Sequence, residues 1–461
     1  MNKVLSGCVV GMWCIGIFAE DAVTTNRIVV DFAQTNGVVK PLHGVNNAPR
    51  KLWGEQESFR EAGIPYMRTH DSCGQWGGAH FVDIPNIFPK FDADEDDPAS
   101  YDFAFTDHWL ATVIGAGTKV FYRLGVTIEN NWKIKAYNIR PPKDFAKWAR
   151  ICEHVVRHYN EGWADGFKWG IDYWEIWGEP ENPPLWQGTR EQYFELYRVA
   201  SKHLKKCFPK IKVGGYGGCG FYALDASKAD DFRKSFLSWF DDFCGFVTNP
   251  ETACPLDFFS WHVYLSGDDV QTISEHSTHV RQALDTVGLV NTENILDEWN
   301  RIGPTENEFD EMKGPLGAAM AGEAFCVMQN VSVDKAMYYD ALPTRRYCGL
   351  YHFPSGRTTM TYEVFRLWNQ LYRLGMAVIC KGAQAGLGVS AARGKSGHAV
   401  LIANNSPVKR MVSVAFLAEG DGQFYLVRLD EDHAQGKDRE VFSTDRSILM
   451  PPRSIVYIAD F

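Results

Sequence analysis

Residues 173–181, Tyr-Trp-Glu-Ile-Trp-Gly-Glu-Pro-Glu, decide the expected fold. The stretch begins as a short apolar and aromatic run, which is typical of a buried strand, and it ends at Gly178-Glu179-Pro180. Pro180 has no backbone N–H to donate and stops the strand, so the carboxylate of Glu179 is expected at the strand's C-terminal end. A second run of the same kind, residues 294–300 (Asn-Ile-Leu-Asp-Glu-Trp-Asn), presents Glu298 in the same way.

Around these two runs, residues 38–370 alternate short β-rich segments with longer helical patterns, which is typical of βα units around a parallel sheet. Strands are expected at Pro41–Val45, Pro65–Arg68, Lys119–Leu124, Tyr173–Trp177, Lys212–Gly215, Phe258–Val263, Asn294–Asp297 and Lys335–Tyr339. The clearest helical patterns lie at Pro142–Tyr159, Arg190–Cys207, Asp230–Phe243 and Val270–Thr286. Eight such strands predict an α/β fold, a (β/α)8 TIM barrel whose active site lies where the strands end.

A second domain is expected after the barrel, in residues 371–461. Short alternating segments are separated there by Gly, Asn, Asp and Lys turns, a pattern that predicts an antiparallel β-sandwich. These segments are Gly388–Ala392, His398–Asn404, Arg410–Phe416, Gln423–Leu429 and Ser454–Ile458. Arg27–Phe32 also has strand composition, so residues 23–37 are expected to complete the sandwich.

The N-terminal residues 1–22 are expected to form a signal peptide. Lys3 supplies the positive start, Val9–Phe18 is mostly apolar, and Ala19 offers a small residue for cleavage. The predicted destination is the periplasm or the extracellular space. Leu5-Ser6-Gly7-Cys8 resembles a bacterial lipidation box but precedes the apolar stretch, so lipoprotein anchoring is the less favoured alternative.

Composition excludes several functional classes. The chain has 461 residues, 47 basic and 57 acidic, and a net charge of −10, which argues against a duplex nucleic-acid binder. No apolar run outside the N-terminus is long enough to span a membrane. The aromatic content of 14% is compatible with a cleft that stacks on sugars.

The 11 cysteines show no zinc-like spacing with histidine, so neither a metal nor a cofactor is expected. Buried free thiols are the favoured interpretation, although Cys244 and Cys254 are close enough in sequence for a disulfide in an oxidising compartment. The oligomeric state stays open.

Two carboxyl groups at one barrel mouth can flank a sugar ring. One protonates the leaving oxygen while the other attacks the anomeric carbon, which gives a covalent intermediate and retained configuration. The less favoured interpretation is that Glu179 and Glu298 are ordinary residues of the mouth.

Several motifs of the barrel region, in this order and spacing, resemble glycoside hydrolase family 39, which contains β-xylosidases and α-L-iduronidases. They are Tyr66-Met-Arg-Thr-His70, Trp174-Glu-Ile-Trp-Gly-Glu-Pro180, Glu191-Gln-Tyr-Phe-Glu-Leu-Tyr197 with Val213-Gly-Gly215, Asp257-Phe-Phe-Ser-Trp-His-Val-Tyr264 and Leu296-Asp-Glu-Trp-Asn300. The resemblance implies that Glu179 is the general acid/base and Glu298 the nucleophile. It further implies that Tyr264 orients the nucleophile, and that Arg68, His70 and His262 line the subsite of the reacting sugar.

The strand period supports part of this assignment independently. Arg68 and His70 are two residues apart, as are His262 and Tyr264, and Glu298 and Asn300, so each pair is expected on one face of its strand. For His262 alone, a core histidine is the alternative.

Trp186, just past the acid/base, is placed to stack on the leaving-group sugar, with simple loop packing as an equal alternative. Arg68 is expected to hold a neighbouring carboxylate ionised. Glu179 is expected to have a raised pKa, because a general acid must start protonated.

Gly178 is a departure from the family, which usually has Asn immediately before the acid/base. That Asn normally donates to the 2-hydroxyl of the reacting sugar, so the identity of the sugar stays open. The predicted function is a retaining glycoside hydrolase that acts on oligo- or polysaccharides from a chain end. The alternative is a non-catalytic carbohydrate-binding barrel derived from such an enzyme; a metal-dependent barrel hydrolase is a third reading, for which no ligand cluster can be assembled.

Overall fold

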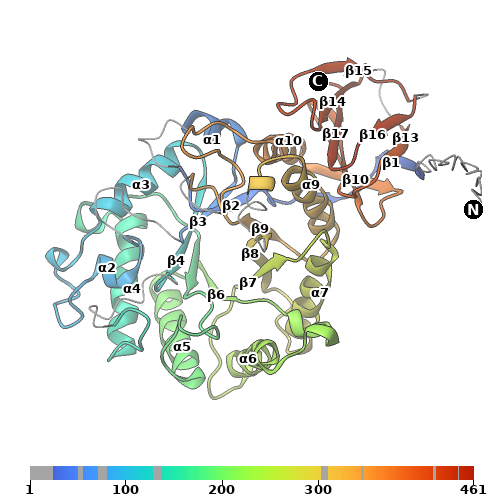
Figure 1. Ribbon diagram of the computed structural model, residues 1–461. Helices are drawn as coiled ribbons and strands as arrows, with labels where there is room; N and C mark the ends of the chain where they lie inside the picture. The colour runs from blue at the N-terminus through green and yellow to red at the C-terminus, as the bar shows by residue number, and fades with distance from the viewer. Residues whose placement is uncertain are drawn as a thin grey trace, which may run out of the picture.

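The computed structural model describes residues 24–49, 56–70, 80–127, 137–302, 310–343, 347–418, 422–444 and 446–461. The predicted signal peptide, residues 1–22, lies outside them. A closed barrel surrounded by helices forms the larger part of the molecule, and a β-sheet domain lies beside it, next to α9 and α10 (Figure 1). This arrangement confirms the predicted fold class.

The barrel closes in chain order, and every pair of neighbouring strands is parallel. Its strands are β2 (Gly44–Asn46), β3 (Tyr66–Arg68), β4 (Lys119–Leu124), β5 (Tyr173–Ile176), β6 (Lys212–Gly218), β7 (Phe258–Leu265), β8 (Glu293–Arg301) and β9 (Lys335–Tyr338). Each overlaps one of the strands expected from the sequence. The strands of a parallel barrel are covered on both faces, so each one is a short apolar run in the sequence. These runs predicted the positions of the strands.

Helices surround the barrel (Figure 1). They are α1 (Gln56–Ala62), α2 (Ile84–Ile87), α3 (Ala104–Gly115), α4 (Phe145–Asn160), α5 (Arg190–Cys207), α6 (Asp231–Thr248), α7 (Gln271–Thr286), α9 (Pro315–Asn330) and α10 (Met360–Leu374). Short 3₁₀ turns add η2 (Pro98–Ser100), η3 (Trp163–Asp165), η4 (Tyr222–Leu224) and η5 (Ala226–Lys228). The start of α5 is fixed by a capping box, in which Thr189 and Gln192 each accept the other's backbone N–H.

The interior of the barrel is layered along the strands. Near the strand starts, an apolar layer is formed by Phe121, Tyr173, Phe258, Ile295 and Met337. Two residues further along three of these strands lie Arg123, Glu175 and Asp297, which are buried and charged or polar. Residues two apart lie on the same face of a strand, so these three side chains also point into the barrel. They form a charged layer that lies closer to the C-terminal ends of the strands than the apolar layer does.

The second domain is one nine-stranded sheet in the order β15-β14-β17-β12-β11-β10-β1-β13-β16. The strands are β1 (Thr24–Val38), β10 (Met376–Lys381), β11 (Leu387–Gly394), β12 (Gly397–Asn404), β13 (Arg410–Leu417), β14 (Tyr425–Leu429), β15 (Arg439–Val441), β16 (Ile448–Met450) and β17 (Ser454–Ala459). The pairing of β1 with β13 is parallel, so the sheet is mixed rather than antiparallel throughout. The rings of Phe32 and Phe424, from distant parts of the sheet order, stack 6.3 Å apart in a common core, because the sheet folds over on itself.

The sheet domain packs directly on the barrel. A Cβ at Gly322 of α9 would come within 2.5 Å of Ile455 Cδ1 and 3.1 Å of Ala403 Cβ, so a larger residue there would force these side chains to shift. Arg453 of the sheet domain also forms an ion pair with Asp268, in the loop after β7. The sheet domain therefore contacts a loop at the C-terminal end of the barrel.

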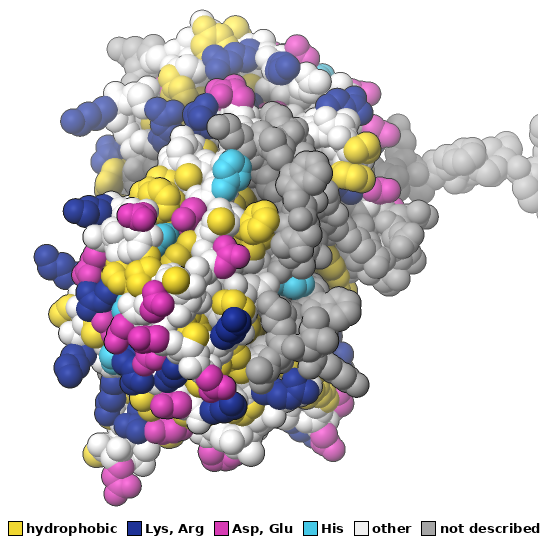
Figure 2. Space-filling view, turned by 90° about the vertical axis from the view of Figure 1, so that its left-hand side faces the viewer, with side chains coloured by type: hydrophobic (Ala, Val, Ile, Leu, Met, Phe, Trp, Pro, Cys, Tyr) yellow, Lys and Arg dark blue, Asp and Glu magenta, His cyan; other side chains and the backbone are white. Residues whose placement is uncertain are grey.

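The surface carries both signs of charge. On the face formed by α2, α3 and α4, acidic and basic side chains alternate without a patch of one sign (Figure 2). None of the helices in the described parts of the chain is long and apolar enough to cross a membrane.

Candidate active site

A cavity of about 820 Å³ opens at the C-terminal ends of the barrel strands. Five of the predicted site residues line it: His70, Glu179, His262, Tyr264 and Glu298. Arg68 lies fully buried beneath them. Residues from β3, β5, β7 and β8 are therefore brought together, as the convergence of strand ends predicts.

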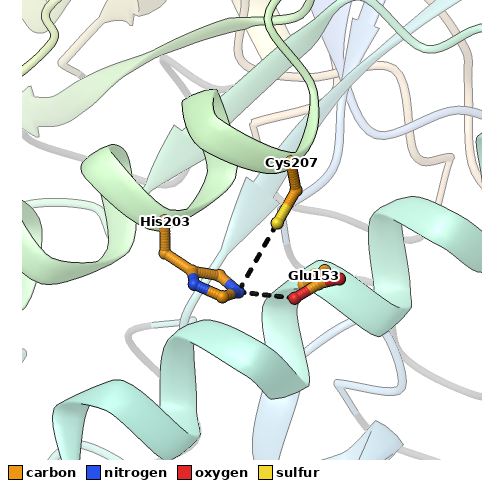
Figure 3. Close-up of side chains that lie close together, drawn as sticks. All are labelled: Glu153, His203 and Cys207. Carbon is orange, nitrogen blue, oxygen red and sulfur yellow. Dashed lines mark hydrogen bonds and ion pairs between the residues drawn. The ribbon is translucent and has the colours of Figure 1, made fainter.

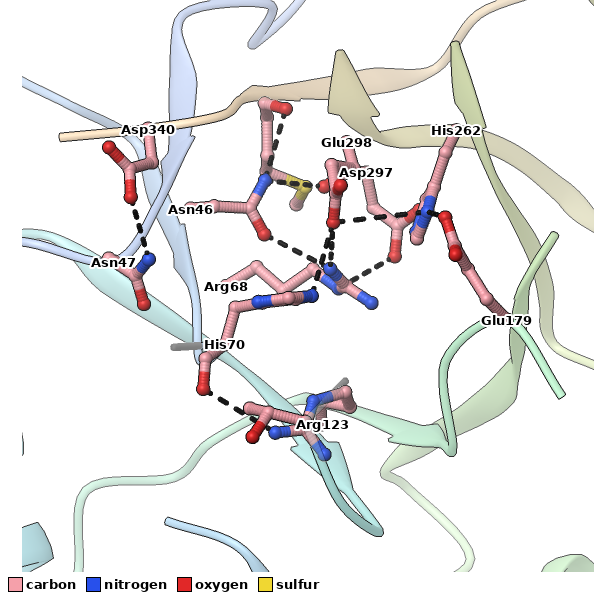
Figure 4. A network of polar contacts seen from close by, with 12 residues as sticks. Asn46, Asn47, Arg68, His70, Arg123, Glu179, His262, Asp297, Glu298 and Asp340 are labelled. Atoms are coloured by element: carbon pink, nitrogen blue, oxygen red, sulfur yellow. Dashed lines mark hydrogen bonds and ion pairs between the residues drawn. The ribbon is translucent and has the colours of Figure 1, made fainter. Parts of the chain in front are cut away.

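Glu298, on β8, is held by donors on both carboxylate oxygens. Tyr264 donates its hydroxyl to Oε1 (2.7 Å), and Arg68 donates Nη1 to Oε2 (3.1 Å). The Nε2 nitrogen of His70 lies 3.3 Å from Oε2 (Figure 4). These contacts fix the side chain at the lining of the cavity.

Glu179 faces Glu298 from the loop after β5 (Figure 4). The backbone φ of Glu179 is +48°, and that of Trp177, two residues earlier, is +74°. Both residues therefore have a strained left-handed backbone conformation. The Glu179 N–H donates to the carbonyls of Tyr216 (3.1 Å) and Gly217 (2.9 Å), which hold the turn in place. One carboxylate oxygen of Glu179 lies within 4.8 Å of an oxygen of Glu298.

The pKa of Glu179 differs from the expectation. Burial by itself raises the pKa of this carboxyl, but His262, which donates Nδ1 to Oε1 (2.8 Å), and Asn182, which donates its amide to Oε2 (2.9 Å), outweigh burial. The result is a pKa lowered to about 2. The predicted upward shift of the pKa was wrong, because nothing in the sequence indicated that His262 would pair with Glu179.

A buried charged cluster supports the site from below. Arg68 Nε lies 2.8 Å from Glu175 Oε2 and 2.9 Å from Asp297 Oδ2. Burial raises the pKa of Asp297 well above its ordinary value of 3.8, whereas Arg68 and hydrogen bonds lower that of Glu175 despite burial. Because the pKa of Asp297 is raised and that of Glu175 is lowered, Asp297 holds the proton and Glu175 the charge.

This division of charge predicts unequal effects of two similar substitutions. Glu175→Gln removes the buried carboxylate that binds Arg68 Nε, so that Glu298 is left to balance the Arg68 charge, and it is expected to lower the free energy of unfolding by about 3–5 kcal/mol. Asp297→Asn replaces a neutral acid by a neutral amide of the same shape, and a much smaller loss is expected. Urea unfolding at pH 7 measures both; equal losses would contradict the assignment.

The pH dependence gives the sign of the Asp297 contribution. Because its folded-state pKa is raised, the folded protein keeps a proton that the unfolded chain loses above about pH 4, so this part of the stability falls as pH rises. Wild type should therefore lose more stability than Asp297→Asn between pH 4 and 7. A difference between the two that does not change with pH would contradict the raised pKa.

Sequence reasoning missed several polar residues of this region. Glu175 and Asp297 were overlooked because each lies next to, or inside, a run interpreted as core strand. Arg123 also lines the cavity, where its Nη2 binds Asp83 (2.7 Å). The sequence did contain a signal for them: each is a charged residue two positions after an apolar residue of the barrel interior.

Two predicted substrate-binding residues lie away from the cavity. Trp186 is only 5% exposed, packs edge-on against Trp177 and Tyr193, and donates its indole N–H to the carbonyl of Thr189. Its position is therefore that of loop packing. Asn300 is buried and donates its amide to the carbonyls of Tyr339 (2.5 Å) and Tyr347 (3.1 Å), so it shapes the wall rather than facing the substrate.

Two glycines let backbone approach the cluster. A Cβ at Gly217, where φ is +63°, would lie 3.0 Å from His262 Nε2 and 3.2 Å from both Arg68 Nη2 and Glu175 Oε1. A Cβ at Gly178 would lie 3.3 Å from Arg68 Nη2 and 3.4 Å from Arg123 Cδ. Gly178 therefore sits directly over the two arginines, where a larger residue requires small shifts.

Two groups of side chains have the composition of metal sites within the described residues. One is Glu179, His262 and Glu298, whose members already hold one another through the contacts described above. The other, at the α4–α5 contact, is Glu153, His203 and Cys207 (Figure 3). Its Glu153 already accepts from Arg157 (2.6 Å) and His203 (2.5 Å), which accounts for the group as an ion-pair network between helices.

Cys244 and Cys254 are both free thiols.

Comparisons with known proteins agree with the family resemblance of the sequence motifs. The sequence profile of "Glycosyl hydrolases family 39" matches residues 23–315. Beta-xylosidases of Geobacillus stearothermophilus and Caldicellulosiruptor saccharolyticus are 26% and 28% identical, each over 228 residues and 47% of this chain. These matches span 38% and 40% of the relatives' own lengths.

Among solved structures, a glucosidase from Croceicoccus marinus has the same fold over nearly the whole chain. The TM-score is 0.74 at 22% identity, with 95% of this chain and 98% of that chain covered. At this level of identity, the similarity extends to the fold alone.

Proposed function

The chain belongs to family 39 of the glycosyl hydrolases, and from this premise we propose that it hydrolyses glycosidic bonds with retained configuration at the anomeric carbon. The observation that carries the proposal is the pair Glu179 and Glu298, with oxygens within 4.8 Å across one cavity. Retaining glycosidases have carboxyl groups about 5–5.5 Å apart, whereas inverting enzymes need about 6.5–9.5 Å to admit a water molecule.

In the first step, Glu298 Oε2 or Oε1 attacks the anomeric carbon while the glycosidic oxygen takes a proton and leaves. Tyr264 and Arg68 hold the Glu298 carboxylate in position at the cavity. In the second step, water attacks the same carbon, gives up a proton, and releases Glu298.

The proton for the leaving oxygen comes from the Glu179–His262 pair. Glu179 has a lowered pKa and accepts a hydrogen bond from His262 Nδ1. Glu179 takes up a proton before the bond breaks, passes it to the glycosidic oxygen as that oxygen leaves, and is left as a carboxylate in contact with His262. The water of the second step returns a proton to the pair, so the cycle balances.

We extend the proposal to removal of sugars from a chain end. A cavity of about 820 Å³ falls within the range of about 300–1,000 Å³ typical of pockets that enclose small ligands. β-Xylosides are the first substrates to try, because two relatives are named beta-xylosidases. Gly178, which cannot bind a 2-hydroxyl through a side chain, calls for a panel with several sugars.

The test is hydrolysis of a panel of aryl glycosides and natural oligosaccharides, with product configuration followed by ¹H NMR from the first minutes. We expect the first product anomer to have the configuration of the substrate. Initial formation of the opposite anomer would overturn the retaining mechanism.

The alternative is a carbohydrate-binding barrel without catalysis, and Gly178 is the observation that favours it. Sugar binding by calorimetry, together with no turnover across the whole panel, would support this alternative. Turnover of any glycoside that is lost with Glu298→Gln would exclude it.

A further inference from the structure

One wall of the cavity is formed by the connection between β6 and α6 and by the first two turns of α6. Tyr222, Lys228, Phe232, Arg233 and Phe236 line this wall. Cys219, at the start of the connection, lines the cavity next to Glu179. A general acid protonates the leaving oxygen, so the leaving group of a substrate must extend along the side of the cavity that Glu179 occupies.

Phe232 is the exposed aromatic residue of this wall. Its side chain is 54% exposed, although it lines a cavity. The ring packs edge-on against the buried Phe236, with centroids 4.7 Å apart and an interplanar angle of 67°. One edge is thus fixed while much of the ring remains available to a ligand.

The wall is tied to the proposed nucleophile through Tyr222. The Tyr222 hydroxyl accepts the N–H of Tyr264 (2.7 Å) and donates to the Tyr264 carbonyl (3.3 Å), and the Tyr264 hydroxyl donates to Glu298. At the other end, Asp230 caps α6 by accepting the N–H of Arg233 (2.7 Å). The position of the wall relative to Glu298 is therefore set by direct contacts.

The charges of the wall are already balanced. Lys228 lies 3.2 Å from Asp225, and Arg233 lies 2.5 Å from Asp230. An anionic ligand would have to compete with these carboxylates. A neutral sugar ring, which presents C–H bonds on one face and hydroxyls at its rim, fits an exposed aromatic ring between paired charges.

We propose that Phe232 is the stacking platform for the first sugar of the leaving group, and that the enzyme selects glycosyl leaving groups through it. The inference rests on the proposed function and adds to it a specificity-determining residue that is absent from every strand-end motif. It takes the role that the sequence suggested for Trp186, which is buried in loop packing.

The test compares two substrates that share the glycone identified by the panel: a disaccharide and the glycosyl fluoride, whose leaving group has no ring. Phe232→Ala should lower kcat/KM for the disaccharide about tenfold and leave that for the fluoride within twofold. Phe232→Tyr, which keeps the ring face, should retain most of the disaccharide rate.

Phe105→Ala is the matched control, because Phe105 is also 43% exposed, lies in the first turn of α3 and packs against a buried phenylalanine, Phe81. It should change neither rate. Equal losses on both substrates, or no loss on the disaccharide, would overturn the platform. If the wild-type protein cleaves neither substrate, the proposed function itself fails, and that result is distinct from a failure of Phe232 alone.

Discussion

Glu298→Gln is expected to reduce turnover of every substrate at least about a thousandfold, whatever the leaving group. The amide is a poor nucleophile and cannot form the covalent glycosyl–enzyme bond. Gln also occupies the same volume, so Tyr264 and Arg68 remain in place and the fold is preserved. The measurement is kcat/KM on the best substrate of the panel, normalised to folded protein by circular dichroism.

Glu293→Gln provides a matched control for this loss. Glu293 lies at the opposite end of the same strand, β8, where it binds Lys335 (2.7 Å) and the Tyr173 hydroxyl. Its removal is expected to reduce stability but not kcat per folded molecule. Turnover near the wild-type rate in Glu298→Gln would remove this residue from the mechanism.

Glu179→Gln is expected to produce a loss that depends on the leaving group. For a sugar leaving group, which needs a proton, we expect about a 10²–10⁴-fold reduction in kcat/KM, the usual contribution of general acid catalysis. For a glycosyl fluoride or a dinitrophenyl glycoside the loss in the first step should be far smaller. A plot of log(kcat/KM) against leaving-group pKa measures the difference as an increased slope.

A second signature belongs to the same residue. In Glu179→Ala the second step lacks its base, and azide, which needs no deprotonation, should restore turnover and give a glycosyl azide of retained configuration. A uniform loss across leaving groups, without azide rescue, would indicate that Glu179 acts only structurally.

Glu181→Gln is the control for position and burial. Burial raises the pKa of Glu181 to about 8, so this neighbouring carboxyl is mainly neutral at pH 7, and it accepts the N–H of Cys219 (2.6 Å). Gln preserves that contact and its charge state. We expect the dependence on the leaving group to stay as in wild type.

The sequence was informative where strand ends alone decide position. Glu179, Glu298, Arg68, His70, His262 and Tyr264 all lie within two residues of the end of a predicted strand, and the barrel brings such ends to one rim. The resemblance to the family, together with the strand period, grouped them in the sequence.

Residues whose position depends on register were less predictable. Along β7 and β8, Trp261 pairs with Leu296 but His262 pairs with Glu298, so Asp297 is an extra residue in the ladder. This irregularity puts both Asp297 and Glu298 within reach of Arg68, which strict alternation of a strand does not allow.

The remaining differences between the sequence-based predictions and the structure lie in loops and helices. Trp186 and Phe232 are both aromatic and both near the site in sequence or in space, yet only the tertiary packing decides which ring faces the cavity. The lowered pKa of Glu179 has the same origin, because it depends on His262, 83 residues away. Neither spacing nor composition carries this information.

The central claim is that Glu298 forms a covalent bond with the sugar during turnover. A 2-deoxy-2-fluoro glycoside of the preferred sugar with an activated leaving group should trap that intermediate, and intact-mass and peptide mass spectrometry should locate it. The account predicts one label per chain, on Glu298, whose formation is abolished by Glu298→Gln. A label on another residue, or complete turnover of the panel with inverted products and no label, would contradict it.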